Sequence, residues 1–158
     1  MAKAWKIKGI QPQRSYRHNA QAILAIRVEE VYSWADAIRD PNNIKELHNL
    51  RISAKRLRYS MELFTINYGE EFQVLLKVLE DLQEHLGDIH DCDVIELVLK
   101  DYLPSIAGQE TAETDAIGIN ALLLRYREMR GKKYQAFLQR WNALEESDFK
   151  GQLLEIIR

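Results

Sequence analysis

The chain has 158 residues, of which 46% are hydrophobic and 29% charged, a composition typical of a soluble globular protein. Its one cysteine, Cys92, excludes an intrachain disulfide and a cysteine-rich zinc site. No apolar run is long enough for a membrane span, and the first residues, MAKAWKIKGI, lack the apolar core of a signal peptide. We therefore expect a cytoplasmic protein in which residues 1–158 form a single domain.

Charge is distributed unevenly along the chain. The net charge is only −2, yet residues 1–28 contain six Lys or Arg and no Asp or Glu. Residues 70–115 contain thirteen Asp or Glu and two Lys. The small net charge thus hides a basic part, which begins with a basic arm over about residues 1–13 and could bind a polyanion.

Apolar residues recur at steps of three and four through most of the chain, and Pro12, Pro41 and Pro104 lie where the pattern breaks. The predicted helices span about residues 14–39, 44–68, 70–102 and from 111 or 114 to 144, with a short last helix within 145–158. Gly69 is expected to end the second helix, and Gly87 to mark a kink or a close helix contact in the third. Short connections make neighbours antiparallel, so we predict an all-α bundle of long antiparallel helical hairpins with four main helices.

The second helix carries the clearest apolar stripe and, beside it, a row of cations. The stripe is Leu47, Leu50, Ala54, Leu57, Met61, Phe64 and Tyr68. On a helical wheel the row consists of His48, Arg51, Lys55 and Arg58, whereas Arg56 points away toward solvent. Like charges one turn apart repel, so such a row indicates either a groove for an anion or pairing with the acidic third helix.

The fourth helix also places cations near its packing face. Arg130 and Lys133 fall on its apolar stripe, so we predict one basic groove lined by the second and fourth helices. Cations spread along a helix suit an extended polyanion, such as polyphosphate, RNA or DNA. Because few aromatic residues accompany the cations, polyphosphate is favoured over nucleic acid.

The segment from His85 to Asp93, HLGDIHDCD, suggests a second function. Its two histidines and three aspartates are residue types that bind metals, and His90-Asp91 is similar to the signature of metal-dependent phosphohydrolases. The other two histidines, His18 and His48, lie in no matching motif. We therefore expect Asp residues here to orient cations of facing helices, and we predict a non-catalytic protein without cofactor or metal, with a phosphohydrolase as the alternative.

Two segments resemble the CHAD family, the conserved-histidine α-helical domain. They are His48-Asn-Leu-Arg51 with Lys55-Arg56-Leu57-Arg58, and Leu86 to Val94. The resemblance implies packed helical hairpins that bind inorganic polyphosphate through His48, Arg51, Lys55 and Arg58. Further candidate cations for this site are Arg56, His90, Arg17, Arg27 and Arg127.

The common form of the CHAD family has two related four-helix halves, whereas this chain shows one set of four long helices. The second helix also carries an additional apolar arc, Ile52, Tyr59, Leu63 and Ile66. Such an arc must be covered by another helix of the chain or by a second copy. A homodimer is therefore one expected assembly.

Overall fold

A computed structural model describes residues 3–158 and confirms the all-α prediction. The helices are α1 Tyr16–Tyr32, α2 Ile44–Phe64, α3 Glu70–Tyr102, α4 Ala112–Glu146 and α5 Phe149–Ile156. Short 3-10 helices, η1 Ala37–Arg39, η2 Thr65–Asn67 and η3 Leu103–Ile106, occupy three of the connections. None of the helices in this part of the chain is both long and apolar enough to cross a membrane.

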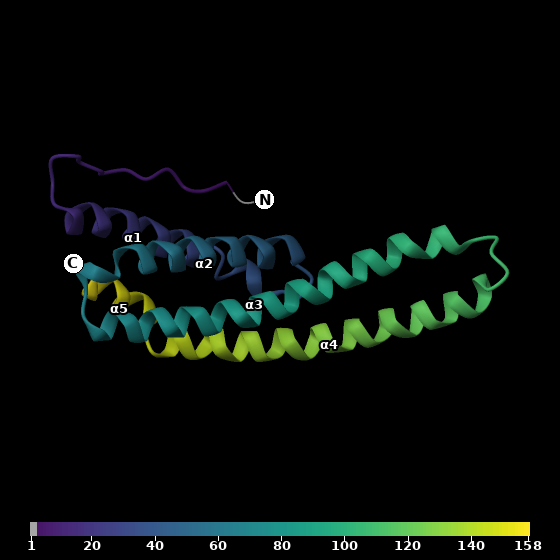
Figure 1. Cartoon of the computed structure of the whole chain (residues 1–158). Helices are drawn as coiled ribbons and strands as arrows, with labels where there is room; N and C mark the ends of the chain where they lie inside the picture. The colour runs from purple at the N-terminus through teal and green to yellow at the C-terminus, as the bar shows by residue number, and fades with distance from the viewer. Residues whose placement is uncertain (1–2) are drawn as a thin grey trace.

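The helices form a bundle from which one hairpin projects (Figure 1). α3 packs along both α2 and α4, α1 packs on α2, and α5 returns against α3 and α4. The distal parts of α3 and α4 run on beyond the other helices as a two-helix arm. This arm has its own small core of Ile106, Ile119 and Leu123.

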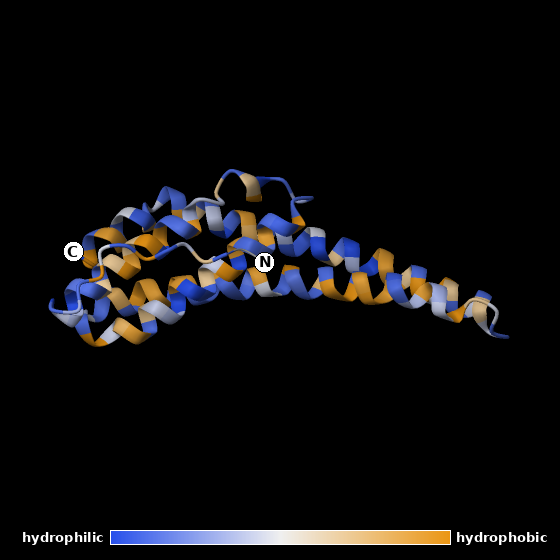
Figure 2. Ribbon diagram, turned by 90° about the horizontal axis from the view of Figure 1, so that it is seen from above, coloured by the Kyte–Doolittle hydropathy of each residue, from blue (hydrophilic) through white to orange (hydrophobic). Residues whose placement is uncertain are grey.

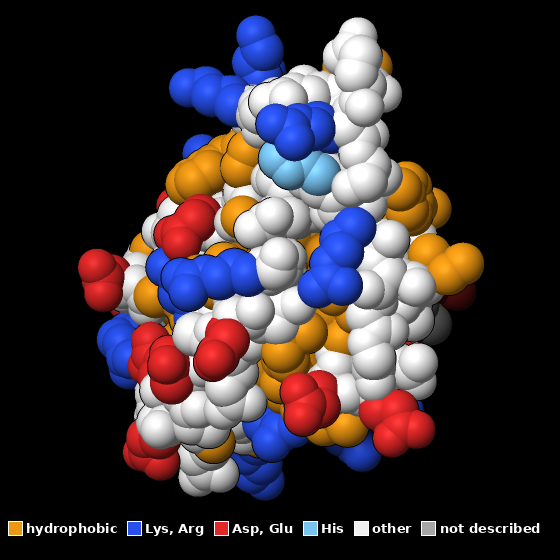
Figure 3. Space-filling model, turned by 90° about the vertical axis from the view of Figure 1, so that its left-hand side faces the viewer, with side chains coloured by type: hydrophobic (Ala, Val, Ile, Leu, Met, Phe, Trp, Pro, Cys, Tyr) orange, Lys and Arg blue, Asp and Glu red, His pale blue; other side chains and the backbone are white. Residues whose placement is uncertain are grey.

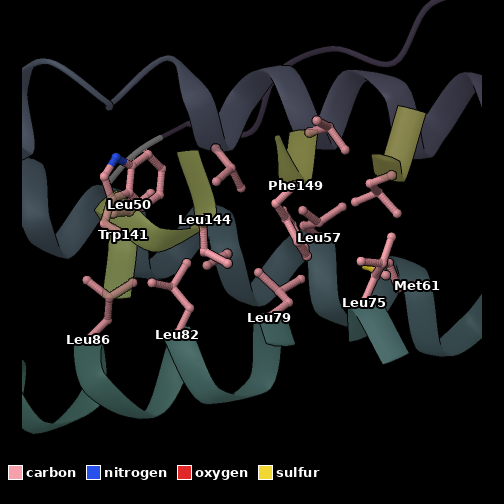
Figure 4. Close-up of a cluster of buried hydrophobic side chains, with 14 of the residues drawn as sticks. Leu50, Leu57, Met61, Leu75, Leu79, Leu82, Leu86, Trp141, Leu144 and Phe149 are labelled. Carbon is pink, nitrogen blue, oxygen red and sulfur yellow. The ribbon is translucent and has the colours of Figure 1, made fainter. Parts of the chain in front are cut away.

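The core of the bundle is built from the predicted stripes. The stripe of α2 from Leu47 to Phe64 is buried, as is that of α3 from Phe72 to Ile89. Side chains of α2, α3, α4 and α5 converge there, among them Leu57, Leu82 and Phe149 (Figure 4). Burying each such side chain contributes about 1.5–3 kcal/mol, so this packing fixes the faces that α2 and α3 turn outward.

The first helix is shorter than predicted. It ends at Tyr32, and residues 33–36 form turns before η1, although the apolar periodicity continues to Ile38. The Ser33 hydroxyl donates to the carbonyl of Glu30, a local bond that competes with continued helix. The Tyr134 hydroxyl lies 3.0 and 2.7 Å from the carbonyls of Ile38 and Arg39, and so fixes η1 on α4.

The end of α2 and the close helix contact that was one of the two options for Gly87 also differ from the prediction. α2 ends at Phe64, and the chain continues as the 3-10 helix η2 to Asn67, one residue before the predicted end at Tyr68. Gly69 precedes α3 in an extended conformation and does not terminate α2. α3 continues through Gly87, and a Cβ there would meet no atom within 4 Å, so Gly87 makes no close helix contact.

The basic N-terminal arm is held on α1 by a buried carboxylate. Glu30 is 1% exposed, and its two carboxylate oxygens lie 2.6 Å from Arg27 and 2.7 Å from Arg56. The backbone N–H of Trp5 donates to Glu30, and Arg27 donates to the Trp5 carbonyl. Glu30 therefore connects α1, α2 and the basic N-terminal arm.

We predict that Glu30→Ala lowers the free energy of unfolding by about 2–3 kcal/mol, because it leaves two partly buried guanidinium groups without their carboxylate. The matched control is Glu29→Ala, which removes an exposed pair with Lys150 and should change stability by less than about 0.5 kcal/mol. Urea denaturation followed by circular dichroism measures both. Equal effects of the two substitutions would contradict the role given to Glu30.

Candidate functional site

The predicted cation row lies along the junction of α2 and α3. At one end the ring of His48 contacts that of His90 on α3, with centroids 4.9 Å apart. At the other end Arg58 lines a recess with Glu80, Gln83 and Glu84 of α3, among others. Since ten residues of helix rise about 15 Å, the row spans a distance suited to an extended ligand.

The middle of the row lacks acidic partners. Within residues 3–158, neither Arg51 nor Lys55 forms a salt bridge, and the buried Arg51 Nε has no hydrogen-bond partner. Arg58 Nε lies 3.5 Å from Glu62 of the same helix without a hydrogen bond, and its guanidinium lies 4.7 Å from the centre of the Tyr59 ring. The row therefore keeps most of its positive charge.

Helix α3 supplies a second wall that the sequence alone does not reveal. Gln83, Gly87 and His90 follow at steps of four and three, on the side of α3 that faces the row. The Gln83 Oε1 atom is buried without a hydrogen-bond partner in the described chain, and Gly87 leaves open space between Gln83 and His90. The spacing of Gln83, Gly87 and His90 in the sequence could have identified them as one stripe of α3. Only the pairing of α2 with α3 shows that this stripe faces the cations.

Acidic residues limit the row at its Arg58 end. Glu80, Asp81 and Glu84 line the recess there together with Lys77. The adjoining end of the bundle presents acids and cations interspersed with hydrophobic surface (Figure 3). The most positive segment consequently runs from His48 to Lys55.

The predicted cations of α4 are held by acids of α3 and do not face the α2 row. Arg130 pairs with Asp93, Lys133 Nζ lies 2.6 Å from Asp88, and Arg127 Nε lies 2.9 Å from Glu96. The hydrogen bond from Lys133 to Asp88 raises the pKa of this lysine. The structure thus places the two predicted halves of the groove on opposite sides of α3, with Asp93 between His48 and Arg130.

The remaining candidate cations also lie away from the row. Arg56, predicted to be a solvent-side cation, instead packs against α1 and bonds to Glu30, where Arg27 joins it. Arg17 donates to the carbonyl of Asn67 and stacks on Tyr68 at the far end of α2. Only His90 joins His48, Arg51, Lys55 and Arg58.

The His85–Asp93 cluster is divided among different neighbours. Asp88 and Asp93 bond to cations of α4, as expected, and His90 contacts His48. Cys92 is buried, which raises the pKa of its thiol. Over residues 3–158, no three His, Cys, Asp or Glu side chains converge in a way that could hold a metal ion.

A family model for the CHAD domain matches residues 2–100. The chain belongs to the CHAD family. The match covers α1, α2 and nearly all of α3, and so contains the row and both segments that resemble the family, whereas α4 and α5 follow it. Searches of curated proteins and of solved structures found no match.

The CHAD-type histidine lies in a setting that favours its neutral form. Burial lowers the pKa of His48, and the neighbouring His90 and Arg51 lower it further, while Asp93 opposes them. At neutral pH the row is therefore carried by Arg51, Lys55 and Arg58, and His48 adds a charge only on acidification.

We predict that affinity for a polyanion rises as the pH falls below about 6.5, the ordinary pKa of histidine, because protonated His48 attracts the anion and neutral His48 does not. Fluorescence titrations with labelled polyphosphate from about pH 8 to about pH 5 measure the change. His48→Asn should flatten this dependence while leaving binding at pH 8 close to that of the wild type. An unchanged pH profile in His48→Asn would contradict it.

Proposed function

We propose that this CHAD protein binds inorganic polyphosphate along the row formed by His48, Arg51, Lys55 and Arg58, without cleaving it. The observation that carries the proposal is the absence of acidic partners for Arg51 and Lys55 within residues 3–158. The cations on α4 that were grouped with them bond to acids instead. A row whose middle cations, Arg51 and Lys55, lack acidic partners within residues 3–158 and whose helix is held by a packed stripe is suited to an anionic ligand.

The shape of the row favours a linear polyanion over a single phosphate. Successive cations are one helical turn apart and follow the groove between α2 and α3, so a chain of phosphates can contact several in turn. Arginine offers a planar pair of donors for phosphate oxygens, and lysine a mobile charge. The short length of the row means that one copy contacts a limited stretch of a long chain.

Polyphosphate fits this surface better than nucleic acid does. Tyr59 is the exposed aromatic beside the row, and Arg58 already covers its ring. Single-strand binding that tolerates any sequence relies on several aromatic platforms between the cations. We therefore place RNA and DNA second, as competitors in the same assay.

We also infer that the acidic segment from His85 to Asp93 has no catalytic role in this binding protein. Asp88 and Asp93 hold Lys133 and Arg130, which positions α4 on α3. Asp91 is exposed, and its charge adds to the effect of Asp88 in raising the pKa of Lys133. This distribution favours a structural role for the segment over a phosphohydrolase centre.

The double variant Arg51→Ala/Lys55→Ala should weaken polyphosphate binding at least about tenfold, since each lost charge–phosphate contact is worth on the order of 1 kcal/mol. The matched control is Arg125→Ala/Lys132→Ala, which removes two exposed cations of α4 and the same net charge. Alanine preserves the helices in both variants.

Isothermal titration with polyphosphate, repeated with single-stranded RNA and DNA as competitors at one salt concentration, distinguishes the outcomes. An equal loss of polyphosphate affinity in the row variant and in the α4 control variant would show that net charge, and not the row, determines binding. Tighter binding of RNA or DNA than of polyphosphate, lost in the row variant, would assign the row to nucleic acid.

A further inference from the structure

The projecting arm creates a notch at its base. We define the arm as residues 97–126 and the notch as the angle between the arm and the end of the bundle where α2 begins (Figure 1). Two adjoining recesses mark the notch, and they share Ile44 and Glu96. The remaining lining residues are Pro41, Asn42, Asp93, Leu97, Lys100, Arg127 and Arg130.

Large apolar side chains are exposed on the notch side of the arm. Leu97 lines the notch and is 61% exposed, and Ile44 opposite it is also exposed. Leu124 and Ile117 precede Arg127 by three and ten residues, which places them on its side of α4, and they are 60% and 68% exposed. Hydrophobic residues recur along both helices of the arm (Figure 2). A two-helix hairpin buries only the sides that face each other, so this surface requires a further partner.

The ends of the arm carry opposite charges. At its base, three cations, Lys100, Arg127 and Arg130, line the notch against two acids, Asp93 and Glu96, and the exposed Lys45 follows Ile44 in the chain, so positive charge is in excess there. At its tip, Glu110, Glu113 and Asp115 are exposed and only Asp115 has a hydrogen bond, from the Thr111 hydroxyl. If the arm of a second copy entered the notch from the opposite direction, its acidic tip would lie against the positively charged base of the first arm.

We propose that two copies of this chain pack as a twofold dimer in which the arm of each lies in the notch of the other. A twofold axis across the arms makes them antiparallel and brings each acidic tip to the other copy's basic notch. The apolar rows that include Leu97 and Leu124 then face each other and complete a four-helix arrangement between the two bundles. The notch adjoins the His48 end of the row through Asp93, and the proposal does not depend on polyphosphate binding.

This interface differs from the one that the second apolar arc of α2 suggests. Tyr59, Leu63 and Ile66 of that arc are exposed, with Ile66 at 86%, so no described helix of the chain covers them. The notch and the tip carry opposite charges that match each other between two copies, and this match favours the arm over the α2 arc. The arm therefore forms the contact, and the α2 arc stays outside it.

Light scattering on a sizing column, at protein concentrations up to about 100 µM, should give about twice the 18.5 kDa chain mass. Leu97→Glu/Leu124→Glu should reduce the mass to that of one chain. Two matched controls should remain dimeric: Val98→Glu/Leu122→Glu on the other side of the arm, and Leu63→Glu/Ile66→Glu on the α2 arc. Circular dichroism should show unchanged helix content and melting in all of them.

A second variant tests the charge pairing without altering apolar surface. Glu110→Lys/Glu113→Lys should raise the dimer dissociation constant about tenfold at low salt, because it places cations against cations. A wild-type mass of 18.5 kDa at every concentration would overturn the proposal. A Leu97→Glu/Leu124→Glu variant that stayed dimeric would also overturn the proposal. So would a control variant that became monomeric while the Leu97→Glu/Leu124→Glu variant remained a dimer.

Discussion

Ion pairs between α3 and α4 determine where this protein keeps its positive charge. Their members are Asp81 with Arg140, Asp88 with Lys133, Asp93 with Arg130 and Glu96 with Arg127. They hold four acids of α3, between Asp81 and Glu96, to cations of α4 between Arg127 and Arg140. The row on α2 receives none of these carboxylates, although it lies beside the most acidic helix of the chain. The electrostatic division seen in the sequence thus becomes a series of ion pairs between α3 and α4 beside a row of cations on α2.

Packing allows α2 to tolerate its row of like charges. Repulsion between cations one turn apart costs about 0.2–0.5 kcal/mol per pair, whereas each buried side chain of the stripe contributes about 1.5–3 kcal/mol. The stripe from Leu47 to Phe64 therefore holds the helix in register, and the row follows on its adjacent face. Arg51 and Lys55 can remain without acidic partners in the folded chain, which is the condition for strong attraction of an anion.

The sequence was sufficient for features that depend on one helix and insufficient for features that depend on two. Periodicity predicted the buried stripe and the cation row of α2, because both follow from the geometry of a single helix. It also placed Arg56 on the side away from the stripe, but it could not show that α1 covers that side with the buried Glu30.

The pairing of helices explains the other differences. Arg130 and Lys133 were recognised near the packing face of α4, yet their partners depend on how α3 and α4 align, which no local pattern specifies. Ser33 and Thr65 are the C-cap residues of α1 and α2, and the hydroxyl group of each bonds back to the helix that it follows. Gln83 and Gly87 belong to the site only because α3 packs against α2, and the sequence pattern does not specify that pairing.

We propose that an anionic chain occupies the α2 row and not the cations of α4 or the N-terminal arm. Side-chain NMR during a titration with short-chain polyphosphate tests it most directly, because each arginine and lysine reports its own contact. We expect the Arg51 and Lys55 resonances to shift first and saturate together, while those of Arg125 and Lys132 do not move. Shifts that concentrate on Arg125, Lys132 or the lysines of the N-terminal arm would contradict it.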